Sequence, residues 1–319
     1  MMATLIDTCS ALVTFLDGLP DCKGYPPKLY VDLEGKNLSR HGTISLVTIL
    51  VHPRDTVHLV DVTTLNSEVF TTKATDGPTL QQILESADIA KVFFDIRHDS
   101  DALYALYGVR VKGICDLQLM QLATRISNRK HVNGLAKCIE RDSTLSSAEK
   151  MKWDKVKKKG CELFAPEHGG DYAVFDRRPL AKEILDYSTQ DVIHMPNLWN
   201  VYRPKLCDAW WNKIVEETER RIKQSQAEAF DSKGKHMAEA PVGWRYWQPT
   251  PAQKKVGMLH KFQGGKAIKE KAAVPVHHTV DLADLLESMS SWDHDEFERE
   301  AEDFAACDSE CGYCGACVY

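Results

Sequence analysis

The order of strand and helix patterns in the N-terminal two thirds of the chain limits the fold more than any other sequence feature. Three apolar, β-branched runs come first, at residues 28–34, 42–51 and 56–62, with turn residues between them. A buried-strand pattern at 89–95 then alternates with helical patterns. A meander of neighbouring strands followed by strand–helix alternation predicts an α/β domain whose sheet has mixed strand directions.

Asp32 and Glu34 lie two residues apart in the first strand-like run. Side chains at i and i+2 point to the same face of a strand, so the two carboxylates project together while Val31 and Leu33 face the other way. Neighbouring carboxylates repel unless a cation neutralises them, and hard oxygen ligands suit Mg²⁺ or Mn²⁺. Taken alone, this Asp-x-Glu pair is equally typical of a solvated strand end.

A second acidic position lies on a long helix predicted over residues 179–199, with a kink near Pro196. One face of this helix carries Leu180, Ile184, Tyr187, Asp191, Met195 and Leu198. Asp191 on an apolar face needs a metal or a hydrogen-bond donor as partner. Tyr187, one turn earlier, is then placed to hold a metal-bound water. A core tyrosine beside a satisfied aspartate is the alternative.

Three aspartates between residues 94 and 108 compete for a third acidic position. Asp99 shares its helix face with the apolar residues Leu103 and Leu106, which turns it inward. Asp101 points roughly 160° away from the centre of that apolar stripe and is expected to be solvated. Asp95, at the end of the preceding strand, is the reserve candidate. We therefore select Asp99.

The order of these motifs resembles the DEDDy family of 3′→5′ exonucleases. That family includes ribonuclease D, the exonuclease domain of Werner-type proteins, the nuclear exosome exonuclease and the proofreading domains of DNA polymerases. The resemblance extends to LVDV at 59–62, NGLAKCI at 133–139 and DRRPL at 176–180. Within the family, the chain is most similar to the 3′–5′ exonuclease domain-containing proteins related to Egalitarian.

The resemblance implies a ribonuclease H-like fold with a mixed five- to six-stranded sheet flanked by helices. It implies a metal-dependent 3′→5′ exonuclease that cleaves single-stranded RNA or DNA from the 3′ end with two Mg²⁺ ions, for which Mn²⁺ can substitute. The implied metal ligands are Asp32, Glu34, Asp99 and Asp191, with Tyr187 orienting the attacking water. The alternative is an RNA-binding adaptor of the same fold with weak or lost catalysis, but none of the four acids is missing here.

Basic side chains near these motifs are candidates for contacts with nucleic-acid phosphates. They are Arg129, Lys130, Arg177 and Arg178. Leu33, between the paired acids, is expected to touch the terminal nucleotide. Six lysines between residues 150 and 159 are better interpreted as a solvated helix face than as a phosphate site. The run WRYW at 244–247 is interpreted as an anchor for the C-terminal extension, with base stacking as the alternative.

The predicted organisation is an exonuclease domain over 1–203, a helix over 204–230, a weakly ordered extension over 231–279 and an acidic, disordered tail over 280–319. The whole chain carries a net charge of −6, but the tail has twelve acidic residues and one arginine. The remaining residues are therefore mildly basic at +5, which suits a polyanionic substrate. Cys307, Cys311, Cys314 and Cys317 are too closely spaced for a typical structural zinc site.

The N-terminus lacks the basic residues of a signal or transit peptide, and no apolar run is long enough to span a membrane. Scattered cysteines without a secretory signal are typical of reduced thiols. A cytoplasmic or nuclear location, with no membrane partner, is therefore expected. Protein partners are not indicated by any motif.

Overall fold

A computed structural model of the protein describes residues 3–19 and 21–253. Its centre is a six-stranded sheet in the order β1-β4-β3-β2-β5-β6. The strands are β1 (Ala3–Ile6), β2 (Leu29–Glu34), β3 (Leu46–Val51), β4 (Thr56–Asp61), β5 (Lys91–Phe93) and β6 (Ile114–Asp116). Strands β2, β3 and β4 form the antiparallel meander, while β1 runs parallel to β4 and β5 and β6 continue in parallel from β2. This mixed sheet confirms the predicted fold class.

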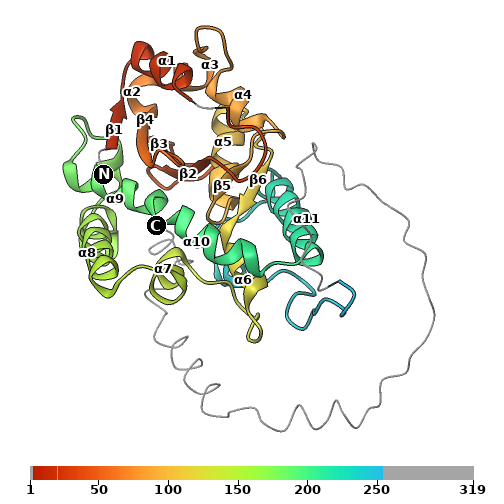
Figure 1. The fold of residues 1–319 in the computed structure, drawn as a ribbon. Coiled ribbons are helices and arrows are strands. Elements are labelled where there is room, and N and C mark those ends of the chain that lie inside the picture. Colours follow the sequence, from red (N-terminus) through yellow and green to blue (C-terminus); the bar gives the residue numbers. More distant parts are fainter. Residues whose placement is uncertain (1–2, 20, 254–319) are drawn as a thin grey trace, which may run out of the picture.

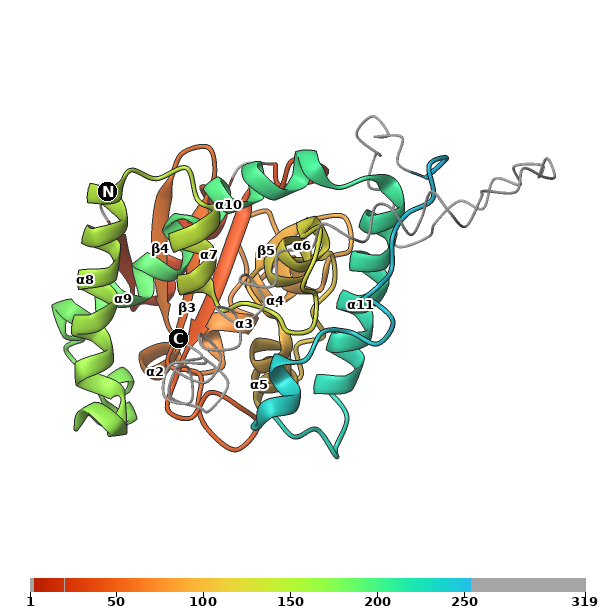
Figure 2. The ribbon, with the colours of Figure 1, turned by 90° about the horizontal axis from the view of Figure 1, so that it is seen from below.

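Helices cover both faces of the sheet (Figure 1). On one side lie α1 (Cys9–Asp17), α2 (Val62–Leu65), α3 (Glu68–Thr71), α4 (Leu80–Glu85) and α5 (Arg97–Tyr107). Packed mainly with the other side are α6 (Leu117–Thr124), α7 (Leu135–Asp142), α10 (Met195–Tyr202) and α11 (Asp208–Ser225). Figure 2 shows α8 (Ser147–Phe164) and α9 (Lys182–Ile193) at one end of the molecule and α11 at the other.

The alternation of side chains along β2 assigns residues to the two cores. Leu29, Val31 and Leu33 join the core formed with α1, α4 and α5, whereas Tyr30 joins the core formed with α6 and α10. Because side chains alternate along a strand, Asp32 and Glu34 lie on the Tyr30 side. The paired acids therefore face the side of the sheet on which the long C-terminal helices of the domain pack.

The helix predicted over 179–199 is two helices in the structure. Helix α9 ends at Ile193, and α10 starts at Met195 with Pro196 in its first turn. A proline ring clashes with the carbonyl four residues earlier and provides no amide donor, so the helix ends rather than bends here. A 3₁₀ turn at Arg203–Lys205 separates α10 from α11 in the same way, with Pro204 near its start.

Residues 231–253 contain contacts that the predicted weakly ordered extension does not anticipate. A 3₁₀ turn at Lys235–Ala238 buries Met237 and Ala238, and Trp244 is 3% exposed. The Trp244 and Trp247 rings lie 5.2 and 4.4 Å from the ring of Trp210 on α11. The aromatic run therefore packs on the domain, as an anchor would. No periodic pattern could reveal this packing, because the segment has little regular secondary structure.

The described residues include no helix that is long and apolar enough to cross a membrane. The acidic tail at 280–319 and its four cysteines, Cys307, Cys311, Cys314 and Cys317, lie outside the described residues.

We predict that Trp244→Ala lowers the free energy of unfolding by about 3 kcal/mol, because a large buried side chain is removed from its contact with Trp210. Tyr246→Ala is the matched control, since its side chain is 80% exposed, and it should change stability by less than about 0.5 kcal/mol. Urea unfolding of the three proteins measures both effects. Equal losses in the two variants would show that Trp244 is not the anchor.

Candidate metal centre

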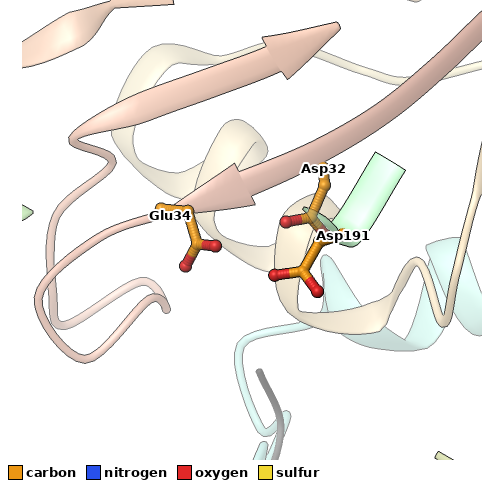
Figure 3. Close-up of side chains that lie close together, drawn as sticks. All are labelled: Asp32, Glu34 and Asp191. Carbon is orange, nitrogen blue, oxygen red and sulfur yellow. The ribbon is translucent and has the colours of Figure 1, made fainter. Parts of the chain in front are cut away.

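Three carboxylates from two different elements meet above the middle of the sheet. Asp32 and Glu34 come from β2 and Asp191 comes from α9, and one oxygen of each lies within 4.8 Å of the others. Figure 3 shows Asp32 and Asp191 side by side, with Glu34 directed into the same space. The strand spacing and the helix face predicted from sequence are therefore brought together as one acidic cluster.

Several polar atoms in this cluster are buried without a hydrogen-bond partner among the described residues. They are Oδ2 of Asp32, both carboxylate oxygens of Glu34, the Thr48 hydroxyl and the Tyr187 hydroxyl. Thr48 lies on β3 directly opposite Asp32. An unpartnered buried oxygen costs free energy, and three of these five are carboxylate oxygens, the ligands that Mg²⁺ and Mn²⁺ prefer. The site thus fits a divalent cation.

Burial and mutual repulsion disfavour ionisation of these acids when no cation is present. The pKa of Glu34 is raised well above its usual value, first by burial and then by the charges of Asp32 and Asp191. The pKa of Asp32 is raised in the same way, with Asp191 and Asp99 as the neighbouring charges. Bound cations reverse this effect, because they favour the ionised form of their ligands.

Asp99 lies beside the cluster rather than within it. It is 5% exposed, in the first turn of α5, and its charge acts on Asp32. Burial raises the pKa of Asp99, while a hydrogen bond from the backbone of Leu33 opposes that rise. Asp99 therefore faces the site from a third element.

The two competing aspartates are both engaged elsewhere. Asp95 accepts hydrogen bonds from Arg97 and faces Arg221 of α11, and these arginines lower its pKa despite burial. The expectation that Asp101 is solvated is wrong, because its side chain is 1% exposed and pairs with Arg40 at 2.7 Å. By helical geometry, Asp99 and Asp101 project to roughly opposite sides of α5, and the backbone and side chain of Arg40 cover Asp101. Helical periodicity cannot predict that a segment distant in the sequence will bury a side chain.

The side chain of Tyr187 is fully buried between α8 and the segment that leads into α9. Its ring packs against Phe164 and Phe175, with centroids 5.0 and 6.4 Å away. Burial raises the pKa of Tyr187 well above its usual value, so the phenol stays protonated and can donate a hydrogen bond. Its free hydroxyl is close enough to Asp191 and Glu34 for their charges to affect it.

Lys157 is the site residue that the sequence analysis missed. Its Nζ donates to both oxygens of Asp191, at 2.6 and 2.8 Å, and lies 3.6 Å from the centre of the Tyr187 ring. The interpretation of the lysine run as a solvated face fails at this one position. The available signal was its spacing, because the buried residues of α8 fall on one face: Trp153, Lys157, Gly160 and Phe164.

Three of the predicted substrate contacts are used within the fold. Leu33 is fully buried in the core that includes α5. Arg129 is 3% exposed and donates to the carbonyls of Arg125 and Trp247. Arg178 forms a two-pronged contact with the buried Asp61, at 2.5 and 2.6 Å. The side chains of Leu33 and Arg129 are therefore buried, and that of Arg178 is held by its ion pair with Asp61.

Two predicted substrate contacts remain accessible. Lys130 is exposed, and the Arg177 side chain is 67% exposed with a 3.6 Å contact to Asp171.

Comparison with known proteins gives one family and a set of similar folds. Residues 3–206 match the family model described as 3′-5′ exonuclease. The mouse piRNA biogenesis protein EXD1 is 36% identical over 91 residues, which are 28% of this chain and only 15% of the mouse protein.

Solved structures of Trypanosoma brucei RNase D share the fold. The GMP complex has a TM-score of 0.59 at 24% identity and covers 76% of this chain and 70% of its own. The complex with RNA U12 has a TM-score of 0.58 at 23% identity, with 76% and 77% covered.

We predict that Glu34→Gln stabilises the metal-free protein near neutral pH. Burial raises the folded-state pKa of Glu34 above its unfolded value of about 4.3. Below that unfolded value both states hold the proton, and as the pH rises towards the folded-state pKa the unfolded chain releases it first, so wild-type stability falls. In EDTA near neutral pH, the variant should therefore have a melting temperature roughly 2–4 °C higher than that of wild type. Near pH 4 the two proteins should have the same melting temperature.

Asp101→Asn is the matched control, because it removes a buried carboxylate that already has an arginine partner. This variant should melt lower than wild type at neutral pH. A Glu34→Gln protein that melts below wild type at neutral pH would show that the Glu34 carboxylate does not destabilise the metal-free protein.

Gly160→Ala should displace Tyr187, because an added Cβ would lie 2.3 Å from Cδ2 of that ring. The better helix propensity of alanine, about 1 kcal/mol, is outweighed by overpacking of about 1–3 kcal/mol or more. We expect lower stability in thermal melts and a changed near-ultraviolet circular dichroism signal. Gly134→Ala is the control, since no atom lies within 4 Å of its added Cβ, and equal effects of the two substitutions would contradict the prediction.

Proposed function

The chain belongs to the 3′-5′ exonuclease family, and on that premise we propose that it removes nucleotides from the 3′ end of single-stranded RNA or DNA with divalent cations. Mg²⁺ is the proposed cation and Mn²⁺ its substitute, because the ligand set consists of carboxylate oxygens. The proposal covers an exonuclease domain at about residues 1–203, with α11 and residues 231–253 packed against it.

The convergence of Asp32, Glu34 and Asp191, with three buried carboxylate oxygens lacking partners, is the observation that carries the proposal. Asp99 adds a fourth carboxylate from α5. Ligands from three separate elements can surround two cations, and four carboxylates supply the opposite charge that two divalent ions require. When bound, such ions activate the attacking water and stabilise the leaving 3′ oxygen.

Tyr187 has the properties needed to orient the attacking water. Its hydroxyl is buried and unpartnered, and it stays protonated because burial raises its pKa. A protonated phenol donates a hydrogen bond to the water and does not remove its proton. The ring is held between Phe164 and Phe175, so the hydroxyl keeps one position relative to Asp191.

The exposure of Lys130 and Arg177 supports a role for their charges as phosphate contacts. The similarity to a mouse piRNA biogenesis protein makes RNA the first substrate to test, with DNA beside it. The adaptor alternative predicts binding of the same strands without cleavage.

The test is a time course with 5′-labelled single-stranded RNA and DNA in Mg²⁺ or Mn²⁺. We expect stepwise shortening from the 3′ end that EDTA abolishes. Asp191→Asn should lower the rate on the order of 10³-fold or more, and Tyr187→Phe by roughly 10²-fold.

The matched control is Asp186→Asn, which removes a carboxylate with a 40% exposed side chain from the same helix and should leave the rate unchanged. Wild-type protein that binds the strands but leaves them intact with both cations would favour the adaptor. Internal cleavage of a circular strand would contradict an exonuclease.

A further inference from the structure

The ion pair between Lys157 and Asp191 is unusual among the buried charges of this domain. The two side chains are 10% and 5% exposed, and the ammonium contacts both carboxylate oxygens. The other lysines of α8 are not buried, and Lys158, the next residue, has a 73% exposed side chain. Removing a lysine from water costs free energy unless the ammonium is paired. The buried position of Lys157 therefore depends on its ion pair with Asp191.

Lys157 acts on the acidic cluster beyond its direct partner. Its charge lowers the pKa of Asp32, of Glu34 and of Asp191, opposing the rise that burial causes in each of them. Lys157 is thus one basic residue whose charge acts on all three acids. In the metal-free protein, Lys157 is therefore a positive charge that balances the cluster.

The proposed metal site needs the same carboxylate that Lys157 holds. An ammonium and a divalent cation that bind the same carboxylate repel each other. Lys157 and the cation would both contact the oxygens of Asp191. The flexible stem of a lysine allows its ammonium to withdraw. The face of the Tyr187 ring, 3.6 Å from Nζ, also stabilises the ammonium and is not a ligand of the cation, so this contact can remain when the ammonium leaves Asp191.

We propose that Lys157 is a built-in counter-ion that holds Asp191 in place in the metal-free protein, competes with divalent cations for it and thereby weakens their binding. This inference rests on the proposed cation site but not on nuclease activity. It assigns to a single lysine two opposite effects, stabilising the metal-free fold and lowering its affinity for the cation. A lysine with a purely structural role would produce only the first.

Mn²⁺ binding to the full chain, measured by isothermal titration calorimetry after removal of metals, tests the proposal. Lys157→Met should bind Mn²⁺ roughly tenfold more tightly than wild type, because one positive charge is removed beside the ligands. Lys158→Met, which removes an exposed lysine from the same helix, should bind as wild type does. An Asp32→Asn protein reports the Mn²⁺ taken up elsewhere on the chain, and that heat is subtracted.

Thermal melting provides the second readout. In EDTA, Lys157→Met should melt below wild type, because the buried Asp191 has lost its partner. Saturating Mn²⁺ should reduce the difference in melting temperature between Lys157→Met and wild type, because the bound cation then balances Asp191. Lys157→Arg keeps the charge and should retain weak, wild-type-like Mn²⁺ binding.

Unchanged or weaker Mn²⁺ binding by Lys157→Met would overturn the proposal, as would a melting difference that is equal in EDTA and in Mn²⁺. If Lys157→Met does not fold, Lys157→Gln replaces it in both experiments. Neither readout needs cleavage of a nucleic acid. A failure of the exonuclease proposal in the labelled-strand assay is therefore distinguishable from a failure of this one.

Discussion

Unbalanced negative charge in a buried place is the constraint on which the rest of this structure depends. Asp32, Glu34 and Asp191 are held together where burial disfavours their ionised forms, and repulsion by neighbouring carboxylates adds to this effect for Asp32 and Glu34. A fold selected for stability alone would not collect carboxylates in this way. The divalent cations proposed for this site would supply the missing positive charge and, by binding only the folded chain, would stabilise it.

Four aspartates away from the candidate metal centre show another way in which this fold balances charge. Each of the four has an arginine partner: Asp61 with Arg178, Asp95 with Arg97, Asp101 with Arg40, and Asp116 with Arg221. Arginine remains charged and forms two hydrogen bonds at once, so such a pair is permanent. In the acidic cluster, Asp191 pairs with a lysine, Lys157, instead of an arginine. A lysine balances part of the charge and can still withdraw, which suits a site that exchanges one cation for another.

One of these arginine pairs, Arg178 with Asp61, helps to position the acidic cluster. Arg178 connects the end of β4 to the segment that enters α9, and so places Asp191 and Tyr187 over the strand that carries Asp32. Gly160 allows α8 to approach Tyr187 closely enough to bring Lys157 to Asp191. Arg40 and Arg221 attach α11 and its following turn to the domain near α5. Residues that would be natural phosphate contacts by charge alone are thereby used to hold the site together.

The amino-acid sequence by itself determined the sheet meander, the shared face of Asp32 and Glu34, and the helix face of Tyr187 and Asp191. These follow from periods of 2 and 3.6 residues, which are local properties of the chain. Tertiary structure alone decided that Lys157 pairs with Asp191, that Arg129 is buried, that Arg178 pairs with Asp61, and that Arg40 covers Asp101. A charged residue is solvated unless a distant segment provides a partner and excludes water, and the sequence pattern around the charge contains no information about that segment.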